Sequence, residues 1–236
     1  MDTHTKPVSL DPAQSVNDAI RTRHSIRAFL PQPVSYETIC EILDVSARAP
    51  SGTNMQPWNT YVITGDRLQE LSNDLLQAHD AQNPENTAEV RYYPKEFFEP
   101  YTARRRKVGW DLYGLLGIEK GEKHKMHVQH GRNFSFFGAP VGLMFSIHRD
   151  LETGSWLDYG MYLQNIMLAA RAKGLHTCPQ AAFTHLHRVI REHISIPDDH
   201  VLVCGMSLGY ADGTAVENTL VTEREPVQAL TKFFGF

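Results

Sequence analysis

The apolar stretches of this chain are short, and two of them flank one strongly periodic helix. Residues 140–148 and 201–208 each have the length of a strand, and the second is apolar on both faces, as in a strand buried within a sheet. Between them, residues 155–173 have the clearest helical pattern, with an apolar face formed by Trp156, Tyr159, Leu163, Ile166, Met167 and Ala170. This arrangement predicts a central sheet flanked by helices.

The remaining patterns agree with an α+β fold built on one sheet of about four strands. Residues 59–64 favour a strand, and helices are expected after the capping residues Ser15, Ser35 and Asp66 and over residues 183–193. Residues 1–14 are polar and predict a loose N-terminal arm, whereas residues 15–236 contain no linker and predict a single domain.

Composition excludes several classes of protein. Hydrophobic residues make up 42% of the 236 and charged residues 21%, with a net charge of −4, so neither disorder nor an overall affinity for nucleic acid is expected. No apolar run is long enough for a membrane helix, and the polar N-terminus does not have the pattern of a secretory signal. Three scattered cysteines favour free thiols. We therefore expect a cytoplasmic protein with no membrane partner.

The most suggestive motif is a run of alternating arginines, AIRTRHSIRAF, directly after the first helix. Arg23, Ser25 and Arg27 would all point to the same side of an extended chain. Guanidinium groups and a hydroxyl match the geometry of a bound phosphate. A solvated basic face is the alternative, and composition alone supports it about equally.

Two further segments carry polar groups suited to a ligand. The loop of residues 50–58 offers the amides of Asn54 and Gln56, and residues 174–181 offer backbone N–H groups and the Cys178 thiol. Each segment could equally be a plain turn. No acid–base set surrounds Cys178, so thiol catalysis is not favoured. The sequence has no GxGxxG or P-loop pattern, which disfavours a Rossmann or P-loop nucleotide site.

Metal and nucleic-acid sites are not indicated by the other polar runs. His124, His127 and His130 step by three along a lysine-rich segment and do not match a known zinc pattern, so we expect no metal. Residues 104–107, with the sequence RRRK, favour a solvated helix face or the rim of a site for an anionic substrate.

Taken in order, several blocks resemble the FMN-dependent nitroreductase family. RHSIRAF is followed by ARAPSGTNMQPW, then by DYGMYLQNIMLAARAKGLHTCPQAAF, VLVCGMSLGYAD and NTLVTEREPV. Together they span residues 16–230, nearly the whole chain. The resemblance implies a mixed, mostly antiparallel sheet and an intertwined homodimer with two FMN sites between the subunits. It also implies a C-terminal arm, about residues 219–236, that wraps the partner, which would cover the apolar Phe233, Phe234 and Phe236.

The resemblance also assigns the cofactor contacts. The residues implied at the phosphate and ribityl chain are Arg23, Ser25 and Arg27, with His24 alongside and Arg224 reaching the phosphate from the C-terminal side. The partner chain would lay one segment against the flavin, through Pro50, Ser51, Asn54 and Gln56. The loop implied beside the reactive ring nitrogen consists of Cys178, Pro179 and Gln180.

The implied activity is reduction of nitroaromatic compounds by NADH or NADPH through FMN. It would proceed in two-electron, ping-pong steps to nitroso and hydroxylamine products or the amine, without an essential side-chain acid or base. Related deiodinases tend to have a threonine where Cys178 stands, and a thiol is the weaker donor, which favours two-electron chemistry. Residues 90–136 would form a lid rich in aromatic side chains. A reductive dehalogenase, a quinone or enone reductase and a non-catalytic flavin-binding protein remain as alternatives.

Overall fold

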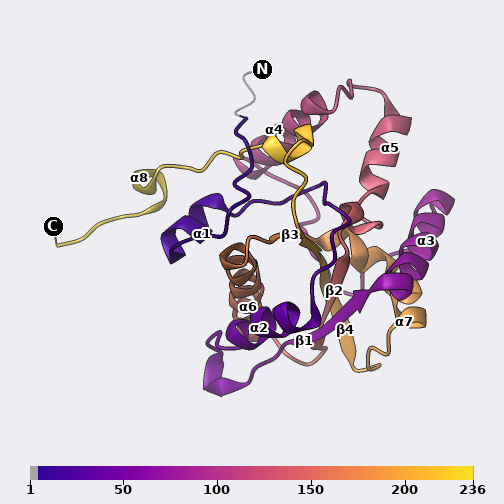
Figure 1. The fold of residues 1–236 in the computed structure, drawn as a ribbon, viewed down its shortest axis with the longest axis horizontal. Helices are drawn as coiled ribbons and strands as arrows, with labels where there is room; N and C mark the ends of the chain where they lie inside the picture. The colour runs from indigo at the N-terminus through magenta and orange to yellow at the C-terminus, as the bar shows by residue number, and fades with distance from the viewer. Residues whose placement is uncertain (1–4, 236) are drawn as a thin grey trace.

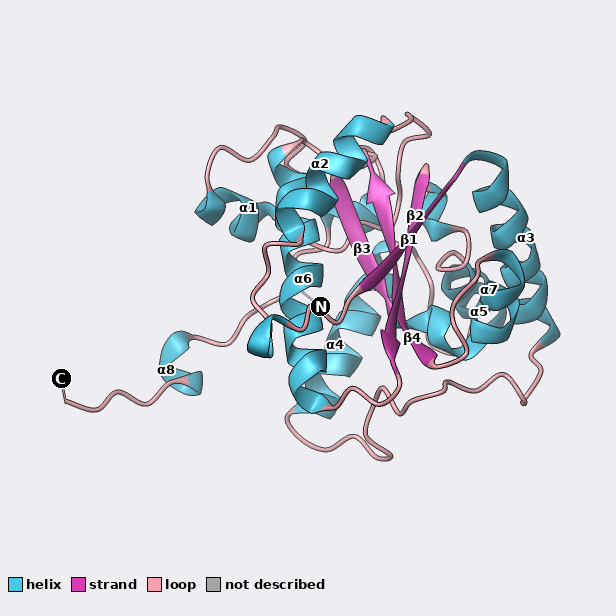
Figure 2. Cartoon of the chain, turned by 90° about the horizontal axis from the view of Figure 1, so that it is seen from below, coloured by secondary structure: helices cyan, strands magenta, loops and turns pink. Residues whose placement is uncertain are grey.

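The computed structural model describes residues 5–235, and its centre is a four-stranded sheet with helices on both faces (Figures 1 and 2). The strands are β1 (Asn59–Thr64), β2 (Val141–His148), β3 (His176–Gln180) and β4 (His200–Gly209). They stand in the order β1-β2-β4-β3, and each neighbouring pair is antiparallel. The expected α+β fold is confirmed, but these strands form an antiparallel sheet and not a mixed one.

Helices α2 (Tyr36–Ser46) and α6 (Thr153–Ala172) cover one face of the sheet, and α3 (Gly65–Ala81) and α7 (His187–His193) cover the other (Figure 2). The first layer packs side chains such as Ile42 and Ile166 against the alternate residues of β2, which are Val141, Leu143, Phe145 and Ile147. Because both faces of β2 and β4 are covered, these strands are buried almost throughout, and apart from Ser146 and Ser207 their buried residues are apolar or glycine.

Glycine in the central strands allows aromatic rings to pack close to the sheet. A Cβ atom on Gly142 would lie 2.6 Å from the ring of Phe136 and 2.7 Å from Leu68. A Cβ atom on Gly205 of β4 would lie 2.4 Å from the ring of Phe183, which is too close for any side chain at this position. The α3 side of the core is therefore built on two positions that accept no side chain.

The structure corrects the interpretation of residues 174–181 as a turn. Gly174 does end α6, with φ of +72°, as its position predicts. The chain then enters β3 and pairs with β4. Pro179 lies within this strand and is tolerated because β3 is at the edge of the sheet, where one side needs no N–H donor. Residues Ala181–Leu186 follow as a 3₁₀ helix ahead of α7.

The expectation of a loose N-terminal arm is wrong for residues 5–13; residues 1–4 of that arm lie outside the described part. The backbone N–H of Lys6 donates to the carbonyl of Thr219 at 3.0 Å. The buried guanidinium of Arg171 donates to the carbonyl of Asp11 at 2.8 Å. His176 bonds to the carbonyl of Ser9 at 2.9 Å through Nε2. The arm is thus fastened to α6, to β3 and to the C-terminal segment.

The remaining helices lie at the periphery of the fold. They are α1 (Val16–Thr22), α4 (Tyr101–Leu115), α5 (Lys123–Gly131) and α8 (Val227–Leu230). The segment expected to act as a lid contains α4 and α5, and the chain beyond residue 226 extends away from the body (Figures 1 and 2). Phe236 lies outside the described residues. Over residues 5–235, no helix combines the length and the apolarity needed to cross a bilayer.

A pH dependence of stability follows from the environment of His176. Burial and the nearby Arg171 lower the pKa of His176 to about 3. Between pH 6.5 and pH 3 the unfolded chain therefore binds a proton that the folded chain does not, so stability falls as the pH falls. We expect this histidine to cost about 2 kcal/mol between pH 7 and pH 5. Urea unfolding of the His176→Gln variant should show a smaller loss over that interval than the wild type.

His124→Gln is the matched control, because His124 is exposed on α5. It should show the same loss as the wild type. An unchanged loss in His176→Gln would contradict the assignment.

Candidate functional site

The alternating arginine motif forms an extended segment that runs beside β3. The N–H of Ile26 donates to the carbonyl of Thr177 at 3.1 Å, and Ser25 forms a parallel bridge with Thr177. Ile26 is fully buried, so its neighbours Ser25 and Arg27 point to the opposite side of the chain. The buried Ile26 holds the segment in the core, and the side chains of Ser25 and Arg27 remain available to bind a ligand.

Asn218 fixes this segment from the other side, and no local pattern in the sequence indicates its role. Its side-chain oxygen accepts the backbone N–H groups of Arg27 and Ala28 at 2.7 and 3.2 Å. Its amide nitrogen donates to the carbonyls of Ala28 and Asp212 at 2.8 and 2.9 Å. One buried side chain therefore satisfies four backbone groups and sets where Arg27 emerges.

His24 serves the same segment rather than the cavity. Its ring nitrogens lie 3.1 and 3.0 Å from the carbonyl oxygens of Thr22 and Asn218. The side chain thus ties the end of α1 to the C-terminal segment. His24 is predicted to lie alongside the phosphate contacts, and its ring helps to hold the backbone of the segment that carries them.

Arg23 and Arg27 lie near Cys178, and Arg224 of the C-terminal segment lies near Arg23. Burial lowers the pKa of Arg23, and the guanidinium of Arg224 lowers it further. Arg23, Arg27 and the Ser25 hydroxyl all lie close enough to the Cys178 thiol to influence its pKa. Within residues 5–235 none of the three arginines forms an ion pair with a carboxylate. Such a group of like charges is suited to binding an anion.

Cys178 itself is buried and carries a neutral thiol. Burial raises the pKa of Cys178, and the opposing effects of Arg27, Ser25 and Arg23 do not cancel it. The nucleophilic form of cysteine is the thiolate, so this environment does not activate it. The thiol is a wall of the site and not a reacting group.

A cavity of about 650 Å³ opens beside this cluster, between β3, α3, α4 and α5. Arg27, Cys178, Pro179 and Gln180 line one wall. The aromatic side chains that line it are Tyr92, Tyr93, Tyr113, Phe134 and Phe137. Most of these come from the segment expected as a lid, whereas Phe136 of that segment is fully buried in the core. A cavity of this size with flat apolar walls suits a planar aromatic ligand.

Gln180 is held rigidly at the edge of the cavity. Its side-chain nitrogen donates to the carbonyl of Asn133 at 2.8 Å, and its oxygen accepts the hydroxyl of Ser207 at 2.7 Å. Gln180 thus links β3 to Asn133, which follows α5, and to Ser207 of β4. The Gln180 side chain therefore forms part of the cavity wall, and these two hydrogen bonds fix its position.

The loop that contains Pro50, Ser51, Asn54 and Gln56 does not reach this cavity within one chain. It lies beside α6, where the N–H of Gly52 donates to a carboxylate oxygen of Asp158 at 3.0 Å. In Figure 1 it lies beyond α2, on the opposite side of the molecule from α4 and α5. It is exposed and held in shape by a hydrogen bond from the Gln56 N–H to the Ser51 hydroxyl, at 3.0 Å.

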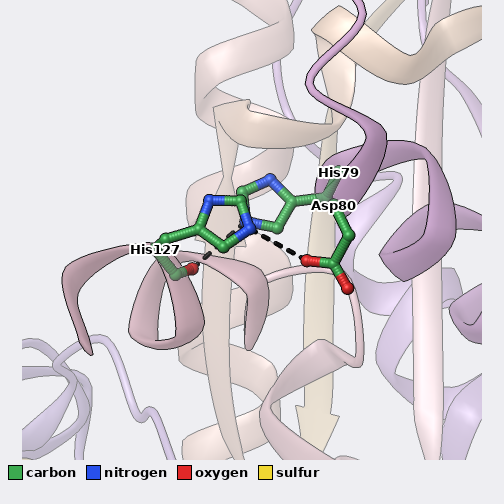
Figure 3. Close-up of side chains that lie close together, drawn as sticks. All are labelled: His79, Asp80 and His127. Carbon is green, nitrogen blue, oxygen red and sulfur yellow. Dashed lines mark hydrogen bonds and ion pairs between the residues drawn. The ribbon is translucent and has the colours of Figure 1, made fainter. Parts of the chain in front are cut away.

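A histidine cluster links α3 to α5 behind the cavity (Figure 3). His127 donates from Nε2 to Asp80 at 2.9 Å, and His79 donates from Nε2 to the carbonyl of His127 at 3.1 Å. The rings of His79 and His127 stack at 4.0 Å with an interplanar angle of 9°. Because imidazole lone pairs lie in the ring plane, two parallel stacked rings do not point at one metal ion. The cluster is therefore a hydrogen-bonded link between helices.

Comparisons with known proteins identify the family of this chain. A sequence profile described as the Nitroreductase family matches residues 20–210. The chain belongs to the nitroreductase family. It is 43% identical over 217 residues to a 4-nitrobenzoate reductase of Pseudomonas putida, covering 92% of this chain and 94% of the relative. It is 39% identical over 218 residues to a nitrobenzene nitroreductase of Ectopseudomonas oleovorans, covering 92% and 96%.

Among solved structures, this nitroreductase-family chain is similar to the FMN and NADPH-dependent nitroreductase NfnB from Sphigopyxis sp. strain HMH. The TM-score is 0.90 at 34% identity, and the match covers 94% of this chain and 100% of that one. The four-stranded antiparallel sheet flanked by helices thus matches the fold of a solved nitroreductase structure.

Asn218 provides a test of how the arginine segment is held in this nitroreductase-family protein. Its replacement by alanine leaves the N–H groups of Arg27 and Ala28 without partners, whereas the carbonyls of Ala28 and Asp212 still accept backbone N–H groups. We expect Asn218→Ala to lower the free energy of unfolding by about 3 kcal/mol. Amide hydrogen exchange should accelerate most at Arg27 and Ala28.

Asn73→Ala is the control, since Asn73 is exposed on α3. It should change stability by less than about 0.5 kcal/mol. Uniform exchange rates across the segment and β4 in Asn218→Ala would show that Asn218 does not act locally.

Proposed function

We propose that this protein is an FMN-dependent nitroreductase that uses NADPH or NADH to reduce nitroaromatic compounds. The observation that carries the proposal is the group of three arginines without acidic partners among the described residues, of which Arg27 lines the aromatic cavity. Relatives at about 40% identity over nearly the whole chain are named for the reduction of nitrobenzoate and nitrobenzene. The NfnB structure is described as FMN and NADPH-dependent.

The residues of the site fit FMN in charge and in shape. A terminal phosphate carries close to two negative charges and would compensate the guanidinium groups of Arg23, Arg27 and Arg224. The Ser25 hydroxyl adds a donor in the same place. The planar ring system would lie against the wall formed by Cys178, Pro179 and Gln180, where the flat aromatic lining begins.

When bound, FMN supplies the redox chemistry, since it accepts hydride from a reduced nicotinamide and passes electrons to a nitro group. The protein provides binding and orientation. The tyrosines and phenylalanines of the cavity hold flat ligands and exclude water, and one shared cavity favours alternating entry of donor and acceptor. The neutral Cys178 thiol neither attacks the substrate nor holds a charge, and we assign no side chain as an essential acid or base.

We also propose a homodimer in which each site takes residues from both chains. Helices α1, α2 and α6 expose apolar side chains, namely Val16, Ile20, Val45, Leu157 and Met161. The C-terminal arm exposes Leu230 and Phe234, and it projects from the body (Figure 2). A partner that covers these surfaces would bring Pro50, Ser51, Asn54 and Gln56 of one chain toward the cavity of the other.

The cofactor proposal is tested by the Arg23→Gln variant. Purified wild type should be yellow and should oxidise NADPH when nitrobenzene is added. Loss of one charged contact to the phosphate should weaken FMN binding roughly 10- to 100-fold, measured by fluorescence titration of the protein stripped of flavin. Arg21→Gln, on the exposed face of α1, should bind FMN like the wild type.

A protein that binds no FMN when reconstituted would refute the proposal. FMN binding without turnover would leave a flavin-binding protein, and halide release from halogenated aromatics without nitro reduction would indicate a dehalogenase.

The dimer proposal is tested by a chain that ends at Glu225. This variant keeps Arg224 but lacks the apolar arm. We expect light scattering to show a shift from dimer toward monomer, together with weaker FMN binding, because the interface loses its largest exposed side chains. A truncated protein that remains fully dimeric would contradict the role of the arm.

A further inference from the structure

The basic run of residues 104–107 is divided by the structure into residues with different roles. Arg104 forms an ion pair with Glu225 at 2.8 Å, and Lys107 forms one with Asp111 at 2.7 Å. Neither is therefore available to a ligand without losing a partner. Arg105 and Arg106 have no ion pair within the described residues, and of these two only Arg105 lines the cavity.

The position of Arg105 is set by an aromatic ring. Its guanidinium lies 4.6 Å from the centre of the Phe97 ring, within range of a cation–π contact. Stacking orients the planar group and reduces the side-chain freedom lost when a ligand binds. The edge of the guanidinium, which carries the N–H donors, remains free to bind a carboxylate through two parallel hydrogen bonds.

The cavity around Arg105 is positive although the whole protein is negative. The net charge is −4, yet no aspartate or glutamate is among the described residues that line the cavity. Its ionisable cationic groups are Arg27, Arg105, His79, His130 and His185. Burial and the neighbouring histidines lower the pKa of His130, so it stays neutral at pH 7. The permanent charges are therefore the two arginines, and Arg27 belongs to the proposed phosphate cluster.

We propose that Arg105 recognises the carboxylate of an anionic nitroaromatic substrate, so that the enzyme prefers nitrobenzoates to neutral nitroarenes. This inference rests on the proposed nitroreductase function and adds the substrate class and the residue that selects it. A positive cavity without acidic groups attracts the anion, and the guanidinium held by Phe97 binds it among the aromatic side chains Tyr92 and Tyr93.

The test compares 4-nitrobenzoate with its neutral methyl ester as acceptors for the FMN-loaded enzyme. The wild type should have the higher kcat/KM for the acid. Arg105→Gln should lower the ratio of the two kcat/KM values roughly 10- to 100-fold, mainly by raising KM for the acid. Unsubstituted benzoate should also become a weaker competitive inhibitor, which provides a readout that does not depend on turnover.

Arg106→Gln is the matched control. It removes the same charge from the next position of α4, outside the cavity, and should leave the ratio unchanged. Added salt should raise KM for 4-nitrobenzoate in the wild type more than in Arg105→Gln.

Several outcomes would overturn this inference while leaving the nitroreductase function intact. One is equal kcat/KM for acid and ester in the wild type. Another is an equal loss for both acceptors in Arg105→Gln, which would indicate a structural role. A third is a rise of KM for NADPH alone, which would assign Arg105 to the phosphates of the dinucleotide. Failure to reduce either nitro compound would instead refute the proposed function itself.

Discussion

The backbone hydrogen bonds of the segment from Arg23 to Ala28 are the constraint on which the site depends. On one side the segment bonds to Thr177 at the start of β3, and on the other its N–H and carbonyl groups are satisfied by Asn218. Arginines with nothing to compensate their charge repel one another, so they would separate if the backbone were free. Because the backbone is fixed, the guanidinium groups stay close together. A bound anion would relieve their repulsion, and this favours anion binding.

The contacts of α4 also affect the charge around the cavity. Helix α4 uses two of its basic residues to bind the C-terminal segment that carries Arg224, through Glu223 and Glu225. Glu223 and Glu225, which flank Arg224 in the sequence, are thus turned toward α4. The cavity between these elements is left with cationic and aromatic walls, which are suited to the two anionic ligands proposed for it.

The sequence predicted most of the architecture but missed elements that are not marked by local patterns. The helices capped by Ser15 and Ser35 and the strands β1, β2 and β4 follow from capping residues and apolar periodicity. β3 was missed because it has five residues, includes a proline and follows a helix-ending glycine, all of which are also typical of a turn. The N-terminal arm was judged loose because its partners, above all Arg171, lie some 160 positions away along the chain.

The sequence alone determined the order of the elements and the alternation that places Arg23, Ser25 and Arg27 on one side of an extended chain, because both are set by neighbours within a few residues. Only the tertiary structure decided which charges meet. Arg224 reaches Arg23, Asn218 supports Arg27, and one arginine of a uniform basic run faces the cavity. These contacts join segments separated by most of the chain, and no local period records them. They depend on how the layers pack around the sheet.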